Sequence, residues 1–310
     1  MPLNDHTAIP YCSIAMATWN GEAFLREQLD SILIQSSGDF ELVISDDAST
    51  DGTRTILESY AARDQRIRLF FNEHNLGYRG NFYKAIGHCR ADRILLSDQD
   101  DRWLPHKIET LLEKIGENLL VFSDSRMVDE KGNAMGRNLS DTVTMLQPGT
   151  PSVNRGFVTG NCVWGHTILF RRALLEHIRH HENEHPHDWW LAVVSSHLNK
   201  IVFCDAVLNE YRQHAGNLTQ AIPRQDAPKK GRKLEEYETQ LSRLKSISDL
   251  AVNEDRVFYE QWYELFLLRQ QRFPLALFFF LLRHQRDVFR MKRKNMLSRI
   301  VEIRKMCRKC

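Results

Sequence analysis

The first 125 residues alternate between short apolar segments and longer amphipathic ones, and this alternation strongly constrains the fold. Five apolar segments have the composition of strands: 11–18, 40–45, 67–71, 93–97 and 118–124. Between them, apolar residues recur at helical spacing, as Leu25, Leu29 and Ile32 do. Strands that alternate with helices predict βαβ units and a mainly parallel central sheet, which is an α/β fold.

Polar and acidic stretches follow three of these segments. The stretches are residues 17–22, 45–53 and 97–101. In a doubly wound sheet the carboxyl ends of parallel strands lie along one edge, so the three stretches should converge there. The last one contains Asp98, Asp100 and Asp101, which repel one another unless a hard cation such as Mg²⁺ or Mn²⁺ binds them. We therefore expect a ligand site with a divalent cation at this edge.

The overall charge is nearly balanced, with 42 Lys and Arg against 40 Asp and Glu and a net charge of +2. This balance gives no global field for nucleic acid, and we expect no nucleic-acid partner. Residues 283–310 are an exception, because they hold eleven Lys or Arg and two acidic residues. A nucleic-acid-binding protein that uses this basic tail is one alternative, although the tail has no known DNA- or RNA-binding motif.

The N-terminus and the cysteines indicate a cytoplasmic protein. Residues 1–10 lack the basic start and apolar stretch of a secretory signal, and six scattered cysteines suggest reduced thiols. The longest apolar run, FPLALFFFLL (273–282), is too short for a spanning helix, which needs about 20 residues. With the basic tail it could lie on the inner face of the plasma membrane. The alternative is a helix that packs on the rest of the protein.

Changes in composition predict the organisation of the chain. Residues 125–160 are polar and glycine-rich, helices are expected near Arg171 and Asp188, and a last strand is expected at 200–205. A polar segment at 220–233 then precedes apolar residues at helical spacing. We predict one domain over 1–220, with halves at 10–125 and 126–220, and a helical C-terminal extension with a basic tail over 221–310.

Five stretches together resemble a known family. They are TWNGEAFLREQLDSI (18–32), LVISDDASTDGT (42–53), NLGYRGNF (75–82), LLSDQDDRWLPHKIE (95–109) and HDWWLAVV (187–194). In order and spacing they resemble the family 2 inverting glycosyltransferases, in particular the rhamnosyltransferase-like bacterial branch. The resemblance covers about residues 11–217 and implies a GT-A (nucleotide-diphospho-sugar transferase) fold. It also implies transfer of a sugar from dTDP-rhamnose or a UDP-hexose to a growing surface polysaccharide such as O-antigen, or to a lipid-linked oligosaccharide.

The resemblance also implies which residues bind the nucleotide. Thr18, Asn20 and Glu22 match the first nucleotide-contacting stretch of the family. Asp47, with Asp46 beside it, matches the carboxylate that reads the pyrimidine edge. A carboxylate suits this role because it accepts a hydrogen bond from the ring N–H of uracil or thymine.

A DxD motif and a candidate base complete the implied catalytic set. Asp98 and Asp100 match the motif, with Asp98 near the ribose or the metal and Asp100 binding the Mn²⁺ or Mg²⁺ that bridges the diphosphate. Asp188 matches the general base of inverting transfer, and His187 replaces the commoner acidic or hydroxyl residue before it. The alternative for Asp188 is a purely structural N-cap of a helix over 189–198.

Further candidates for acceptor or diphosphate contacts lie beyond the nucleotide-binding half. The resemblance suggests Trp164 and His166 for the acceptor, and Arg212 and His214 for the diphosphate. The alternatives are buried packing for Trp164 and a solvated loop for residues 211–217.

Two other function classes remain as alternatives. The stretch HENEH (181–185) has the H-E-x-x-H spacing of zinc proteases, although Pro186 stops a helix directly after it. A non-catalytic nucleotide-sugar-binding relative would require loss of the metal or base carboxylates, and these are present.

Overall fold

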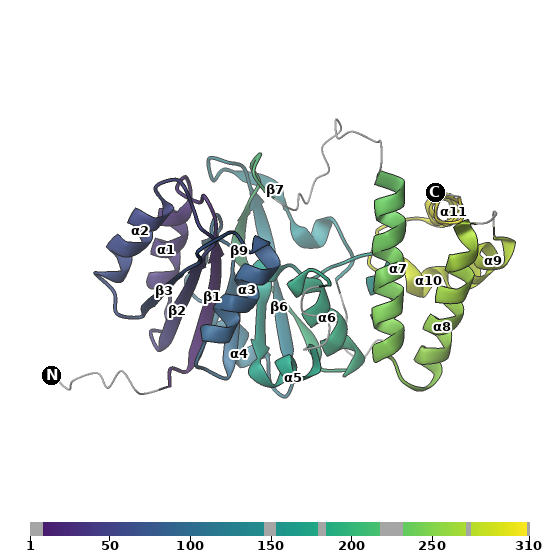
Figure 1. The fold of residues 1–310 in the computed structure, drawn as a ribbon, viewed down its shortest axis with the longest axis horizontal. Coiled ribbons are helices and arrows are strands. Elements are labelled where there is room, and N and C mark those ends of the chain that lie inside the picture. The colour runs from purple at the N-terminus through teal and green to yellow at the C-terminus, as the bar shows by residue number, and fades with distance from the viewer. Residues whose placement is uncertain (1–8, 146–152, 179–183, 218–231, 271–273, 309–310) are drawn as a thin grey trace. The chain divides into compact units, whose positions relative to one another are not determined.

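The computed structural model describes residues 9–145, 153–178, 184–217, 232–270 and 274–308. The chain forms two compact units (Figure 1). The first unit runs to Leu139 and adds Val163–Ala192 and Lys200–Asn217. The second consists of Ser140–Cys162, Val193–Asn199 and the segment from Leu218 onward. Two segments from earlier in the chain therefore join the C-terminal helices.

A nine-stranded mixed sheet forms the centre of the first unit, and six of its strands run in the same direction. The strand order is β3-β2-β1-β4-β8-β6-β9-β5, with β7 paired to β6. The bounds are β1 Cys12–Thr18, β2 Phe40–Asp46, β3 Ile67–Phe71, β4 Arg93–Ser97, β5 Arg102–Trp103, β6 Leu120–Val128, β7 Ala134–Asn138, β8 Ile168–Arg171 and β9 Ile201–Arg212. The predicted α/β fold with a mainly parallel sheet is confirmed.

The strands β3, β2, β1 and β4 form a parallel half with helices between them. These strands are connected by α1 Leu25–Leu33, α2 Thr53–Ala61 and α3 Gly77–His88, and α4 Lys107–Lys114 follows β5. Strands β1 and β2 are almost entirely buried, and α3 lies along both of them (Figure 1). Leu25, Leu29 and Ile32 of α1 are completely buried, because their spacing places them on one helix face.

The other half of the sheet contains two features that the sequence did not predict. Strand β8 inserts antiparallel between β4 and β6, and the helical segment predicted near Arg171 begins after it, at Arg172. Four residues are too few for a periodic pattern to reveal a strand. Strand β9 continues to Arg212, well past residue 205, because it pairs with β6 on one side and with β5 on the other. Tyr211 and Arg212, expected in a loop, therefore belong to a strand.

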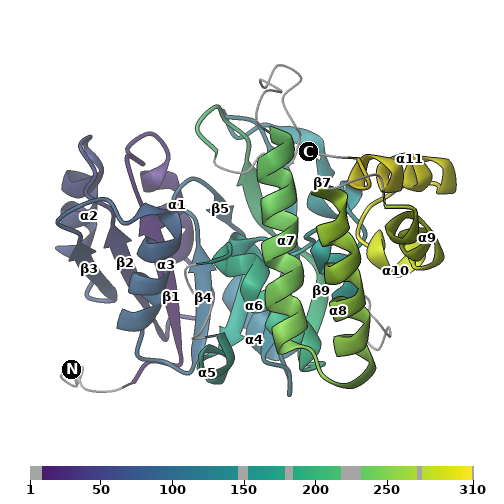
Figure 2. The same ribbon diagram turned by 45° about the vertical axis from the view of Figure 1, so that its right-hand side comes forward.

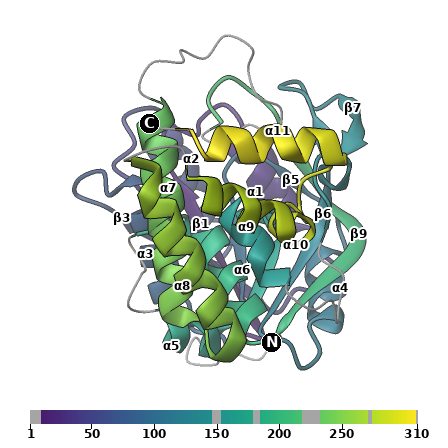
Figure 3. The same ribbon diagram turned by 90° about the vertical axis from the view of Figure 1, so that its right-hand side faces the viewer.

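The second unit is mainly helical, as predicted for the C-terminal extension (Figures 2 and 3). Its helices are α7 Arg232–Leu250, α8 Asn253–Leu267, α9 Leu275–Arg283, α10 Gln285–Val288 and α11 Met296–Met306. Tyr237 of α7 stacks on Phe266 of α8, and Arg155 donates to Asp255 at 2.9 Å. Among the described residues, every helix is too short or too polar to span a bilayer.

Candidate active site

Side-chain hydrogen bonds tie together the loops that follow β1 and β2. Thr18 Oγ1 donates to Asp46 Oδ1 at 2.9 Å, and Asp46 Oδ2 accepts from Ser49 N at 3.0 Å. Asn20 has a φ of 47°, in the left-handed region that Asn tolerates better than most residues. Its backbone N donates to Ser49 Oγ, and its Oδ1 accepts from Thr50 N at 2.8 Å. Thr18, Asn20 and Asp46 are therefore brought together, as the strand-end positions predicted.

The carboxylates of Glu22 and Asp47 hold the same loops. Glu22 Oε2 accepts from Gly52 N at 2.8 Å, and a Cβ at Gly52 would lie 2.8 Å from the Glu22 carboxyl carbon. Asp47 Oδ1 accepts from Asn72 Nδ2 at 2.8 Å and from Leu76 N at 2.7 Å. Asp47 is only 2% exposed. These two carboxylates thus already bind protein donors, which fixes the shape of the loops around them.

Gln99, in the middle of the DxD motif, connects the acidic loop to the loop after β1. Its Oε1 accepts from Trp19 N at 2.9 Å, and its Nε2 donates to Trp19 O at 3.0 Å. A Cβ at Gly21 would lie 2.4 Å from Gln99 Oε1, so the close approach depends on glycine at this position. The Trp19 side chain is 53% exposed beside this junction. The three polar stretches therefore meet at one edge of the sheet.

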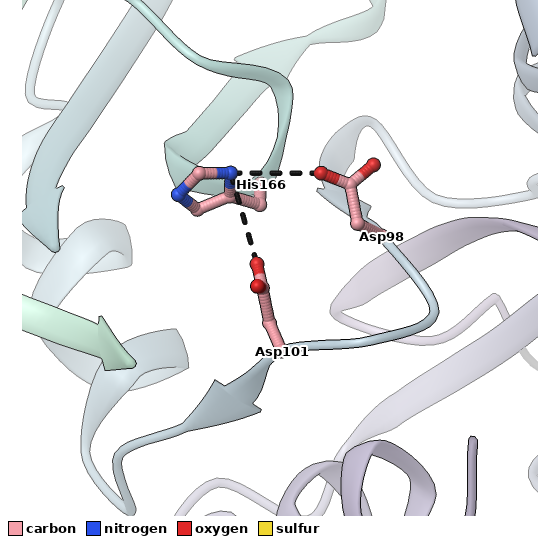
Figure 4. Close-up of side chains that lie close together, drawn as sticks. All are labelled: Asp98, Asp101 and His166. Carbon is pink, nitrogen blue, oxygen red and sulfur yellow. Dashed lines mark ion pairs between the residues drawn. The ribbon is translucent and has the colours of Figure 1, made fainter. Parts of the chain in front are cut away.

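Asp98, Asp101 and His166 form a cluster whose ligand atoms lie within 4.8 Å of one another (Figure 4). His166 Nδ1 is 3.5 Å from Asp98 Oδ2 and 3.7 Å from Asp101 Oδ2. The other ring nitrogen of His166 lies 3.1 Å from Ser125 Oγ, and the ring stacks on Tyr211. Two carboxylates and an imidazole form a donor set that could bind a divalent cation. His166, assigned to the acceptor by resemblance, thus lies beside the acidic loop.

Asp101 belongs to a fully buried polar network. Its Oδ2 accepts from Asn209 Nδ2 at 2.9 Å and its Oδ1 from Arg212 N at 3.1 Å. Lys107, equally buried, donates to Asn209 Oδ1 at 3.1 Å. Burial raises the pKa of Asp101 and lowers the pKa of Lys107, since each charged form loses its hydration. The sequence assigned no role to Lys107 or Asn209, although Lys107 lies within one of the five family stretches.

Asp100 has a different histidine as its neighbour. Its Oδ2 lies 2.8 Å from His214 Nε2. Arg212 is 2% exposed, and it donates to Asp100 O at 2.9 Å and to Glu27 Oε2 at 2.7 Å. Arg212 therefore braces the acidic loop against α1, while Asp100 and His214 face one another directly.

The predicted base lies in helix α6 (His187–His197). Asp188 is in the first turn, and its Oδ1 accepts from Trp189 N at 2.8 Å. Helix α6 begins before Asp188, because Trp190 N donates to Pro186 O at 3.0 Å. Asp188 is therefore not the N-cap of a helix over 189–198.

His187 is buried without a hydrogen-bond partner for its ring. The side chain is 5% exposed and stacks on Phe82 with ring centroids 4.1 Å apart. Neither ring nitrogen has a partner among the described residues. Burial lowers the pKa of His187, while Asp188 and Asp98 oppose that shift. This orphan ring is therefore a candidate for contact with a ligand or an ordered water.

The remaining predicted residues lie near these groups or outside the described ranges. Trp164 is partly buried and directly precedes the turn η3 (Gly165–Thr167), which carries His166. The zinc-protease pattern begins at residues 181–183, which lie outside the described residues. Its last residue, His185, packs against the rings of Trp189 and Trp190.

Comparison with known proteins identifies the family. A family model described as glycosyl transferase family 2 matches residues 13–179. The chain belongs to this family. A dTDP-rhamnosyl transferase, RfbG, from Shigella flexneri is 39% identical over 103 residues, covering 32% of this chain and 36% of that protein. A GalNAc(5)-diNAcBac-PP-undecaprenol beta-1,3-glucosyltransferase from Campylobacter jejuni is 25% identical over 175 residues, covering 56% of each chain.

A solved structure confirms the GT-A fold of this family 2 member. The crystal structure of S. aureus TarS 1–349 in complex with UDP-GlcNAc has a TM-score of 0.59 at 16% identity, covering 95% of this chain and 89% of that one. Likeness at this identity establishes the fold alone. The chain spans about half the length of the curated relatives that it matches.

Proposed function

We propose that the protein is a metal-dependent inverting glycosyltransferase that uses a nucleotide-diphospho-sugar donor. The observation that carries this proposal is the junction of Gln99 with Trp19, which joins the DxD loop to the loop after β1 in a family 2 fold. A donor must contact both loops at once, since its nucleotide and its diphosphate are covalently linked. The junction supports the proposal because it holds the two loops beside each other.

The nucleotide would bind the loops that Thr18, Asn20 and Glu22 hold in shape. Asp46 and Asp47 remain the candidates for reading the pyrimidine edge, and Asp47 would accept the base N–H through Oδ2, since its Oδ1 already accepts from Asn72 Nδ2 and Leu76 N. The exposed Trp19 indole offers a surface on which a pyrimidine can stack.

The residues present fit a divalent cation. Asp100 Oδ2 and His214 Nε2 are hydrogen-bonded at 2.8 Å, and both would be available as ligands once the shared proton is lost. We favour this pair as ligands, with Asp98 close by, because Asp101 is buried and already accepts two hydrogen bonds. A bound Mn²⁺ or Mg²⁺ would offset the charge of the leaving nucleoside diphosphate.

Asp188 is the proposed general base. Its carboxylate would accept the proton of an acceptor hydroxyl while the hydroxyl oxygen forms a bond to the sugar C1. The bond from C1 to the diphosphate oxygen breaks on the opposite face, which inverts the configuration and releases the nucleoside diphosphate. His187 and His166 would contact the donor sugar or the acceptor, together with Trp164, and Arg212 would hold the diphosphate-facing loop.

The donor and the acceptor are proposed from the relatives. The Shigella protein is named for a dTDP-rhamnosyl donor, and the Campylobacter protein for an undecaprenol-linked acceptor. We propose dTDP-rhamnose or a UDP-hexose as donor, and a growing surface polysaccharide or lipid-linked oligosaccharide as acceptor. The reaction would take place in the cytoplasm, at the inner face of the plasma membrane.

A donor screen tests the proposed function. UDP-, dTDP- and GDP-sugars are incubated with the protein and Mn²⁺, and the released nucleoside diphosphate is measured. We expect turnover with a UDP- or dTDP-sugar that stops in EDTA. Binding of a donor without turnover in the presence of diverse acceptors would instead indicate a non-catalytic relative.

A further inference from the structure

Helices α9 and α11 of the second unit lie beside each other (Figure 3). Each has buried apolar residues on one face and exposed apolar residues on another. Leu277, Phe280 and Leu281 of α9 are buried, and so are Ile303 and Met306 of α11. Burial of these residues anchors the two helices to the rest of the second unit. The side chains on the exposed faces of α9 and α11 do not take part in this packing.

Large apolar side chains occupy the outer faces. On α9, Leu275 is 63% exposed and Phe279, one turn later, is 62% exposed. On α11, Leu297 is 74% and Val301 54% exposed. Exposed apolar residues at a spacing of four lie on the same side of a helix and form a stripe. We call the outer faces of these two helices the α9–α11 surface.

Basic residues are abundant in the same part of the chain. Residues 274–308 hold ten Lys and Arg and two carboxylates, a local net charge of +8. Both carboxylates are neutralised within the unit: Asp287 pairs with Arg290, and Glu302 pairs with Lys292. The exposed Lys and Arg residues within 274–308 are Arg283, Arg286, Arg293, Arg304, Lys305 and Arg308.

The charged and apolar residues of α11 share one face. Leu297, Val301 and Arg304 are spaced by four and three residues, which keeps them on a single side of the helix, and the exposed Arg308 follows the end of the helix. One exposed side of the helix is therefore apolar at its start and basic toward its end. Apolar side chains of this kind can insert into a bilayer interface, and the cations can bind anionic headgroups. Nucleic acid would complement the cations but would leave Leu297, Val301 and Phe279 in water.

We propose that the α9–α11 surface binds the interface of a lipid bilayer rich in anionic headgroups. Leu275, Phe279, Leu297 and Val301 enter the boundary between headgroups and acyl chains, and the exposed Arg and Lys side chains contact lipid phosphates. This inference rests on the second unit alone and is independent of the donor and acceptor proposed above. An enzyme with a lipid-linked acceptor would meet that acceptor more often when confined to the same surface.

The test is sedimentation of the full-length protein with vesicles, in low and high salt. One vesicle set contains phosphatidylglycerol and phosphatidylcholine, and the other contains phosphatidylcholine alone. The variants are Leu297→Ser with Val301→Ser, and Arg304→Glu with Arg308→Glu. Ile34→Ser is the matched control, because Ile34 is also an exposed apolar residue (69%) but belongs to the first unit.

We expect the wild type and Ile34→Ser to pellet with anionic vesicles and high salt to release part of the protein. Each double variant should lower the bound-to-free ratio by about tenfold or more, since apolar insertion and lipid charge both contribute to such binding. Nucleotide release from a donor in vesicle-free solution should stay unchanged in all variants, which separates this inference from the proposed function. Equal pelleting of the wild type and both double variants, or no pelleting of the wild type in low salt, would overturn it.

Discussion

The Gln99 side-chain amide makes two antiparallel hydrogen bonds with the backbone of Trp19, one through its oxygen and one through its nitrogen. The two residues are 80 positions apart, yet this pair fixes the distance between the loop after β1 and the acidic loop after β4. The amide can make both hydrogen bonds only if no neighbouring side chain occupies its place. Gly21 provides that space.

The first prediction is that Gly21→Ala impairs donor use more than stability. Its new Cβ would displace the end of a flexible Gln99 side chain, so the unfolding free energy should fall by only about 1 kcal/mol. The loss of the Trp19 junction should lower kcat/KM at least tenfold. Gln99→Ala removes both the junction and the side chain with which a Cβ at position 21 would collide. In the Gln99→Ala background, Gly21→Ala should therefore lower kcat/KM little further. Additive losses in the double variant would mean that the junction is not the reason for glycine.

The second prediction distinguishes the two candidate metal-binding groups. Asp100→Asn and His214→Gln should each weaken Mn²⁺ binding in the presence of the nucleoside diphosphate, measured by electron paramagnetic resonance, and leave thermal unfolding nearly unchanged. Asp101→Asn should instead lower the stability by about 2 kcal/mol, since an amide NH2 would replace one of the two buried oxygens that accept from Asn209 Nδ2 and Arg212 N. Unchanged Mn²⁺ affinity in Asp100→Asn and His214→Gln, with loss in His166→Gln, would move the metal to the Asp98–Asp101–His166 cluster.

The third prediction concerns the base. Asp188→Asn is nearly isosteric but cannot accept a proton at neutral pH, so turnover should fall by about two to four decades. Calorimetry should show donor-nucleotide affinity close to that of the wild type, because the nucleotide loops are distant in sequence and independently held. The variant's amide can still accept from Trp189 N, which preserves the start of α6. A loss of turnover smaller than tenfold would contradict the proposed role.

The fold was largely predictable because, in the first half of the chain, each strand and helix has its own local pattern of apolar residues. The strands at 67–71 and 93–97 begin and end where apolar runs meet polar flanks, and the sheet edge followed from their alternation with helices. The missed strand β8 and the extension of β9 depend on partners far along the chain. No local pattern encodes those partners.

The candidate site was predictable as a location but less so as a set of contacts. The sequence indicated that three loops converge, yet not that Asp100 meets His214 across 114 positions. Asp101 looked equivalent to its neighbours in the sequence, and only the sheet order shows that it is fully buried beside Asn209. Three carboxylates within four residues thus have three environments: Asp98 is partly exposed beside His166, Asp100 pairs with His214, and Asp101 is fully buried.

The fourth prediction is a pH dependence of stability that arises from Glu41. Burial alone raises the pKa of Glu41, but hydrogen bonds from Ser13, Arg90 and Arg68 outweigh it and hold the pKa below its usual value of 4.5. A depressed folded-state pKa means that this stabilisation is complete above pH 4.5 and is lost as the pH falls through the folded value. Denaturant unfolding between pH 3 and 7 measures it.

Glu41→Gln provides the control for this measurement. The variant should lose about 2 kcal/mol of stability at pH 7, since charged hydrogen bonds become neutral ones. Its stability should also vary less with pH below 4.5 than that of the wild type. An identical pH profile in the two proteins would place the acid sensitivity elsewhere.

The last prediction uses the orphan ring of His187. In His187→Phe the aromatic ring can keep its stacking on Phe82, while both unpartnered nitrogens disappear from a buried position. Removing a polar group that is buried without a partner should leave the unfolding free energy unchanged or raise it by about 1 kcal/mol. If the nitrogens bind the donor sugar or the acceptor, kcat/KM should fall at least tenfold in the same protein. Greater stability combined with lower activity is the expected sign of a residue kept for a ligand. His187→Phe with full activity, or with a stability loss of several kcal/mol, would show that the ring serves the fold instead.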